Sequence, residues 1–161
     1  MNESSAKISA DEKYRYLLRR RWSSGPVVLW IMLNPSTADA MKDDPTIRRV
    51  RSFSMGRVGF GEFRVVNLFA LRATDPSELE RSENPVGPDN DATIAYEMAH
   101  AKMIVVAWGC RDSRLVAERA RGVLEMLPRP LYCVGHSAGR PRRPLYVRGS
   151  HGIVPFVELS K

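Results

Sequence analysis

The chain has 161 residues, of which 43% are hydrophobic and 27% are charged. These proportions are ordinary for a globular domain, and they exclude collagen, wholesale disorder and disulfide scaffolds. The 25 basic and 18 acidic residues give a net charge of +7, and 20 of the basic residues are arginines. Because arginine is suited to phosphates and other planar anions, this excess favours nucleic acid or a nucleotide as a partner.

The distribution of apolar residues and cysteines bears on the compartment. No apolar run approaches the roughly 18 residues that span a membrane, and the polar N-terminus holds no signal segment. We therefore expect a cytoplasmic protein without membrane contact. Cys110 and Cys133 fit a reducing compartment, and three histidines give no zinc-type cluster, so we predict no metal and no cofactor. Nothing in the sequence indicates a protein partner.

The N-terminal part of the chain is expected to form a tail followed by a β-hairpin. Residues 1–12 are polar and predict a flexible tail, and residues 13–161 predict a single α/β domain. Tyr14–Arg20 is expected to form an edge strand, which the turn Ser23–Pro26 returns antiparallel into the strand Val27–Leu33. The second strand is apolar on both faces, as in the centre of a covered sheet.

The rest of the chain alternates between helices and strands. Asp44 and Pro45 form an N-cap with proline at the first helical position, which predicts an arginine-rich helix that ends near Met55. Further strands are expected over 63–69, 103–108 and 131–134, helices over 90–101 and 113–127, and a long loop with one short helix over 74–88. This order predicts an α/β fold: a three-layer α/β/α sandwich with a mostly parallel central sheet and an antiparallel N-terminal edge strand.

Ligands of open parallel sheets bind beyond the carboxyl ends of the strands, and polar residues follow several strand ends in this chain. Asn34 precedes Pro35, which restricts its backbone to an extended conformation. Its amide either reads a base edge or caps the turn. Asn67 interrupts an apolar run, where an unpartnered amide costs about 1–3 kcal/mol. We therefore expect Asn67 either to bond loop backbone or to face a ligand.

Two carboxylates are the first candidates for acid–base chemistry. Asp39 has no evident structural task, and Asp44 comes second because a residue that caps the helix can have a catalytic role as well. Trp108 and Gly109 form a strand-to-helix turn, whose glycine allows close backbone approach and whose helix N-terminus attracts anions. Cys110 follows at that helix end, but no histidine neighbours it in sequence, which disfavours a nucleophilic thiol.

Six segments carry a family resemblance. They are Leu33-Asn34-Pro35-Ser36-Thr37-Ala38-Asp39, Asp44-Pro45-Thr46-Ile47-Arg48-Arg49, Val66–Thr74, Pro85-Val86-Gly87 with Asn90-Asp91, Ala107-Trp108-Gly109 and Pro141–Tyr146. Together they resemble the bacterial and phage family called domain of unknown function 1643 (DUF1643). The resemblance extends over nearly the whole chain beyond residue 13.

The order of an Asn-Pro turn, a strand ending in Asn-Leu, a strand ending in Trp-Gly and a late Pro-Leu loop is also similar to the uracil-DNA glycosylase superfamily, an α/β/α fold. That resemblance implies that Asn34 positions water or the sugar and that Asn67 reads the base. It further implies that Arg143 with Pro144 grips DNA and the developing anion. Arg143 stands where both families lead us to expect histidine; arginine stabilises an anion but does not titrate.

We therefore predict a protein that acts on nucleic acid or a nucleotide, as a hydrolase that takes a flipped base into the crevice and cleaves its N-glycosidic bond. The predicted site comprises the catalytic residues Asn34, Asp39 and Asp44 and the substrate-binding residues Pro35, Ser36, Thr37, Asn67, Trp108, Gly109, Arg142, Arg143, Pro144 and Tyr146. Two alternatives stay open. One is a non-catalytic nucleic-acid or nucleotide-binding module on the same fold, and the other is a small-molecule hydrolase or transferase that uses Cys110.

Overall fold

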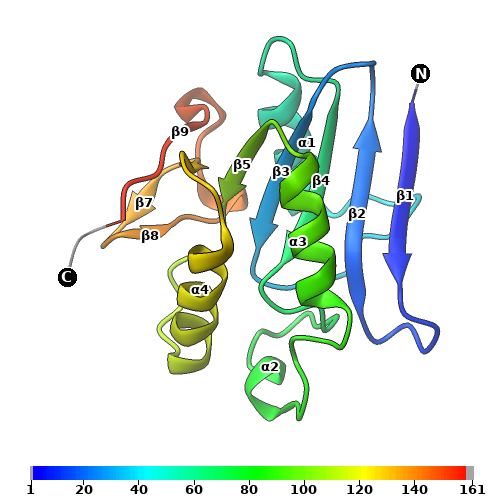
Figure 1. Cartoon of the computed structure of the whole chain (residues 1–161), viewed down its shortest axis with the longest axis vertical. Coiled ribbons are helices and arrows are strands. Elements are labelled where there is room, and N and C mark those ends of the chain that lie inside the picture. Colours follow the sequence, from blue (N-terminus) through cyan, green and yellow to red (C-terminus); the bar gives the residue numbers. More distant parts are fainter. Residues whose placement is uncertain (1, 159–161) are drawn as a thin grey trace.

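The protein is built on a seven-stranded sheet, seen in a computed structural model that describes residues 2–158 (Figure 1). The strand order is β1-β2-β4-β3-β5-β6-β9. Four neighbouring strands run parallel: β4 (Glu62–Asn67), β3 (Val27–Met32), β5 (Met103–Val106) and β6 (Tyr132–Cys133). The predicted α/β class with a mostly parallel central sheet is confirmed.

The N-terminal edge of the sheet differs from the sequence prediction. The flexible tail expected over residues 1–12 is wrong, because Glu3–Ile8 form the edge strand β1, antiparallel to β2 (Arg15–Arg21). The polar composition suggested a tail, but an edge strand is held by backbone hydrogen bonds and can expose most of its side chains, as β1 does. The expected hairpin is also wrong: β2 is an interior strand that pairs with β4, since β4 and β5 occupy both sides of β3.

The C-terminal segment adds structure beyond the last predicted strand. After β6 the chain forms a small hairpin of β7 (His136–Ser137) and β8 (Arg140–Pro141). Two single-turn 3₁₀ helices follow at Pro144–Tyr146 and Gly149–His151, and β9 (Val154–Pro155) then pairs antiparallel with β6. These elements were not predicted because each is only two or three residues long, which is too short for hydrophobic periodicity to be visible.

Helices cover both faces of the sheet. α3 (Asn90–His100) and α4 (Arg114–Met126) pack on the face toward the viewer in Figure 1, and α1 (Pro45–Met55) packs on the other. The remaining helix, α2 (Glu78–Arg81), is the single turn expected inside the long loop after β4. The three-layer arrangement predicted from the alternation of elements is therefore present. No helix within residues 2–158 is long and apolar enough to cross a membrane.

β3 contributes side chains to the apolar cores on both faces of the sheet, because successive side chains of a strand point to opposite faces. Leu29 and Ile31 join the core under α3 and α4, whereas Val28 and Trp30 join the core under α1. All four side chains are completely buried. The result is a rigid central strand whose C-terminal end presents the next residues, beginning with Leu33 and Asn34, at one edge of the sheet.

Candidate functional site

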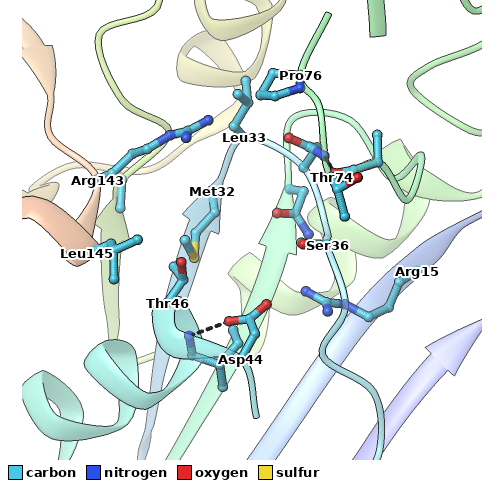
Figure 2. Close-up of a pocket in the computed structure, with 15 residues that line it drawn as sticks. Arg15, Met32, Leu33, Ser36, Asp44, Thr46, Thr74, Pro76, Arg143 and Leu145 are labelled. Atoms are coloured by element: carbon cyan, nitrogen blue, oxygen red, sulfur yellow. Dashed lines mark hydrogen bonds between the residues drawn. The ribbon is translucent and has the colours of Figure 1, made fainter. Parts of the chain in front are cut away.

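A pocket of about 160 Å³ opens where the parallel strands end (Figure 2). Met32 and Asn67, the last residues of β3 and β4, line it together with Ala107, which directly follows β5. The chain leaves β3 toward α1 on one face and β5 toward α4 on the other, so these ends form a topological switch point. The other lining residues are Arg15, Leu33, Asn34, Ser36, Asp44, Thr46, Ile47, Ala73, Thr74, Pro76, Arg143 and Leu145.

Asn67 is buried at this pocket with an unused hydrogen-bond donor. The residue is 1% exposed, and its Nδ2 has no hydrogen-bond partner within residues 2–158. The neighbouring loop is held instead by Asn90, whose Nδ2 donates to the main-chain oxygens of Asn67 at 2.9 Å and Leu68 at 3.2 Å. Of the two roles expected for Asn67, these contacts fit the one in which it faces a ligand, because an unpaired buried donor costs about 1–3 kcal/mol.

Asn34 holds the loop after β3 together. Its Nδ2 donates to the main-chain oxygens of Pro35 at 3.0 Å and Ala73 at 2.8 Å, which is the capping role considered for it. Both N–H bonds of the amide are thereby engaged, and Oδ1 is the atom left to contact a ligand. Ser36 also lines the pocket, whereas Pro35 is buried and Thr37 is exposed outside its lining.

The two predicted catalytic carboxylates are placed differently. Asp44 lines the pocket, and as the N-cap of α1 its Oδ1 accepts from the main-chain N of Ile47 at 2.9 Å. Asp39 lies outside the lining, and its Oδ1 accepts from the main-chain N of Met41 and of Lys42, each at 2.9 Å. These hydrogen bonds hold the pKa of Asp39 below its ordinary value, which makes it a weaker base. Asp39 therefore has a structural task in its own turn, contrary to the sequence analysis.

Arg15 is a pocket residue that the sequence analysis did not identify. It begins β2, is 2% exposed, and its Nη1 donates to the main-chain oxygen of Ala38 at 2.7 Å. Its guanidinium points toward Asp44 (Figure 2). No sequence signal marked it, because arginine in a strand expected at an edge would be solvated. Two further polar lining residues, Thr46 and Thr74, were also not predicted.

Arg143 reaches the pocket from the side opposite Arg15 (Figure 2). Gly109 permits this approach: its φ is +93°, and a Cβ there would lie 2.9 Å from Cγ of Arg143. The close approach expected at Gly109 is thus made by a side chain of this protein. Pro144 is buried and starts the 3₁₀ turn that follows Arg143, so it positions this arginine without lining the pocket.

A second pocket, of about 490 Å³, adjoins the first and shares Pro76 and Arg143 with it. Arg111, Arg142 and Tyr146 line this second pocket, and its lining includes no acidic residue among the described part of the chain. Three of the predicted binding residues, Gly109, Arg142 and Tyr146, therefore lie beside the first pocket rather than inside it.

Trp108 takes no part in either pocket. It is 3% exposed, belongs to the core beneath α4 and borders a separate groove of about 610 Å³. Its prediction as a binding residue of the strand-end site is therefore not supported by its position. Within residues 2–158, no group of three His, Cys, Asp or Glu side chains is placed to hold a metal ion.

A sheet with a switch point and a polar pocket at its strand ends defines an α/β protein of the doubly wound class. Within that class, the chain belongs to the family described as protein of unknown function (DUF1643), whose model matches residues 15–145. This match confirms the family resemblance of the sequence motifs, and it includes every residue that lines the first pocket. Searches of curated proteins and of solved structures found no match.

Proposed function

We propose that the first pocket binds a single nucleobase and that the protein acts on nucleic acid or a nucleotide by cleaving the N-glycosidic bond of that base. The observation that carries this proposal is Nδ2 of Asn67, a buried donor at the pocket with no partner within residues 2–158. Buried donors are nearly always paired, so this one indicates a ligand that presents an acceptor, such as a base carbonyl.

The size and lining of the pocket suit one planar ring. A cavity of roughly 150 Å³ holds benzene, so about 160 Å³ accommodates a six-membered heterocycle. Met32, Leu33 and Leu145 offer apolar contacts to the ring faces, and the polar lining offers donors and acceptors to its edge. A base in a duplex has to be extruded from its stack to enter such a pocket.

Asp44 and Arg143 supply the charges that hydrolysis of the bond requires. As the bond between C1′ and the base nitrogen breaks, its electron pair stays on that nitrogen, and Arg143 stabilises the departing anion. Water adds through its oxygen to C1′, and its proton passes to Asp44. The carboxyl then returns this proton to the base, and Arg143 contributes only its positive charge.

The second pocket supports a polymeric substrate. Arg111, Arg142 and Arg143 offer cations to backbone phosphates, and the exposed ring of Tyr146 offers a stacking surface beside them. Because this pocket shares Arg143 with the base pocket, a base in the first pocket and its flanking phosphate in the second are adjacent.

A second candidate function is a non-catalytic nucleic-acid or nucleotide-binding module. One observation favours it: the amide N–H bonds of Asn34, the residue expected to position water or the sugar, are taken by Pro35 and Ala73. In this alternative the same pocket recognises a base, and the bond to the sugar stays intact.

The test uses single- and double-stranded oligonucleotides that carry normal, deaminated or otherwise modified bases. Salt-dependent mobility shifts report binding, and alkali-labile abasic sites report cleavage. We expect Asn67→Ala to lose both signals by at least tenfold, because it removes the donor to the base. Asn2→Ala removes an exposed amide that lines neither pocket and serves as its control.

Asp44→Asn separates the two candidate functions. Asparagine still caps a helix, so α1 keeps its first turn while the carboxylate is lost. Cleavage that disappears in Asp44→Asn with binding retained supports the hydrolase. Binding without abasic product in the wild-type protein supports the module, and the absence of both signals contradicts a nucleobase pocket altogether.

A further inference from the structure

Arg15 has more hydrogen-bonding capacity at the pocket than the protein uses. Its Nη1 donates to the main-chain oxygen of Ala38 at 2.7 Å. Within residues 2–158, its buried Nε has no partner, and its Nη2 makes no hydrogen bond or ion pair. Because a guanidinium carries five N–H bonds in a planar fork, most of this fork lacks an acceptor.

Arg20, on the same strand, shows a buried arginine whose role is structural. It is 3% exposed, and its Nε donates to Asp43 at 2.9 Å, its Nη1 to the main-chain oxygen of Arg19 at 2.9 Å, and its Nη2 to that of Asp39 at 2.6 Å. It does not line the pocket. Both arginines fasten the loop after β3, but Arg15 keeps donors beyond that task.

The charges at the pocket favour a negatively charged ligand. The charged lining residues are Arg15, Arg143 and Asp44, which give a formal net charge of +1. Burial lowers the pKa of Arg15 to about 10, although the charge of Asp44 opposes this shift, so the cation is held with few compensating partners. An anionic ligand would compensate this charge, whereas a ligand rich in N–H donors would not.

We propose that Arg15 is a binding residue that selects bases with an acidic, carbonyl-flanked edge and prefers their anions to their neutral forms. This inference rests on the proposed function, because it takes the bound ring to be a nucleobase. The free N–H groups of Arg15 donate to a carbonyl oxygen or an ionised ring nitrogen, and Nδ2 of Asn67 donates to a second acceptor. Arg143 lies on the side of the pocket opposite Arg15 (Figure 2), so it would contact the ring from there.

The test compares three free bases by calorimetric titration at mildly alkaline pH: 6-azauracil, uracil and cytosine. 6-Azauracil is isosteric with uracil but more acidic, so it is largely the anion under conditions where uracil is neutral. We expect the wild-type protein to bind 6-azauracil about tenfold more tightly than uracil, and cytosine more weakly than either. Arg15→Met should abolish the preference for 6-azauracil, and Arg20→Met, the matched buried arginine, should keep it.

Three outcomes are decisive. A preference for 6-azauracil that is lost in Arg15→Met and kept in Arg20→Met supports the inference. Equal binding of 6-azauracil and uracil by the wild-type protein, or a preference that survives in Arg15→Met, overturns it and leaves the base pocket standing. Binding of no base by the wild-type protein overturns the proposed function and this inference together. If Arg15→Met does not fold, Arg15→Gln decides, because glutamine is neutral and keeps a polar N–H donor at this buried position.

Discussion

Two buried polar regions lie on the same sheet and differ in how completely their donors are paired. In the first, the Glu62 carboxylate accepts from Arg19 at 2.6 Å and from Arg64 at 2.5 Å, and Arg64 also binds Glu97 at 2.6 Å. In the second, the pocket, Arg15 and Asn67 hold buried N–H groups without partners within residues 2–158. Both regions therefore bury charged groups, and they differ in whether the buried donors are paired.

The paired region joins three elements. Arg19 comes from β2, Glu62 and Arg64 from β4, and Glu97 from α3, so the ion pairs fasten the N-terminal half of the sheet to its covering helix. Each group has an opposite charge within hydrogen-bond distance, so the network leaves no charge for a ligand to neutralise. We interpret this region as structural and expect it to dominate stability.

The largest expected effect comes from breaking this network with Glu62→Ala. The side chain is 5% exposed, and its loss removes the acceptor that two partly buried arginines share. Arg64 then keeps only Glu97, and Arg19 keeps only the more exposed Glu3. We expect the free energy of unfolding to fall by about 3 kcal/mol, measured by urea denaturation. Glu118→Ala removes an exposed carboxylate paired with Arg114 and should change it little. A small effect of Glu62→Ala would contradict the structural role of the network.

The ionisation of Glu62 also predicts how the stability of the protein depends on pH. Burial alone would raise the pKa of Glu62, but hydrogen bonds from Arg19 and Arg64 outweigh it and leave that pKa below its ordinary value of 4.5. A lowered folded-state pKa stabilises the protein above the unfolded-state pKa, and this stability is lost as pH falls through the folded-state value. Glu62→Gln removes the carboxyl that titrates. The free energy of unfolding of this variant should therefore fall less than that of the wild-type protein when the pH is lowered below about 4.5.

The sequence was sufficient to predict the layers of the fold, but it was not sufficient to predict which strands lie next to one another in the sheet. The apolar run of β3 and the cap at Asp44 identified a buried strand and the start of α1, because both signals are local. The position of β2 beside β4 depends on pairing between residues about 45 apart, such as Arg19 and Arg64, which no local pattern reveals.

The residues of the candidate site also fall into those that the sequence predicted and those that it did not. Asn34, Asn67 and Asp44 were found because parallel strands and the helices after them bring their ends together at one edge. Arg15 was missed because its burial follows from the unexpected interior position of β2. Asp39 was overvalued because its partners are the main-chain N–H groups of its own turn, and these appear only once the loop is built.

An intermediate effect is expected where the pocket depends on backbone geometry, at Gly109→Ala. Alanine at a φ of +93° is strained by about 1–3 kcal/mol, and its Cβ would push Arg143 away from the pocket. We expect lower stability together with weaker binding of an oligonucleotide. Gly122→Ala is the control: it lies in α4 with open space around its Cβ position, so it should raise stability by about 0.5–1 kcal/mol. Unchanged binding in Gly109→Ala would separate Arg143 from ligand recognition.

The smallest effect on stability is expected for Arg142→Ala. This variant also tests most directly whether the second pocket binds a backbone phosphate. Its side chain is exposed in the second pocket, so Arg142→Ala should change the free energy of unfolding by no more than about 0.5 kcal/mol. If Arg142 contacts a backbone phosphate, the slope of log K against log salt for an oligonucleotide should become shallower by about one. Arg114→Ala, which also removes an exposed arginine but outside both pockets, should leave that slope unchanged. An equal change of slope in both variants would mean that the basic surface attracts nucleic acid diffusely, and that the second pocket does not guide a flanking phosphate toward the unpaired donors of the first.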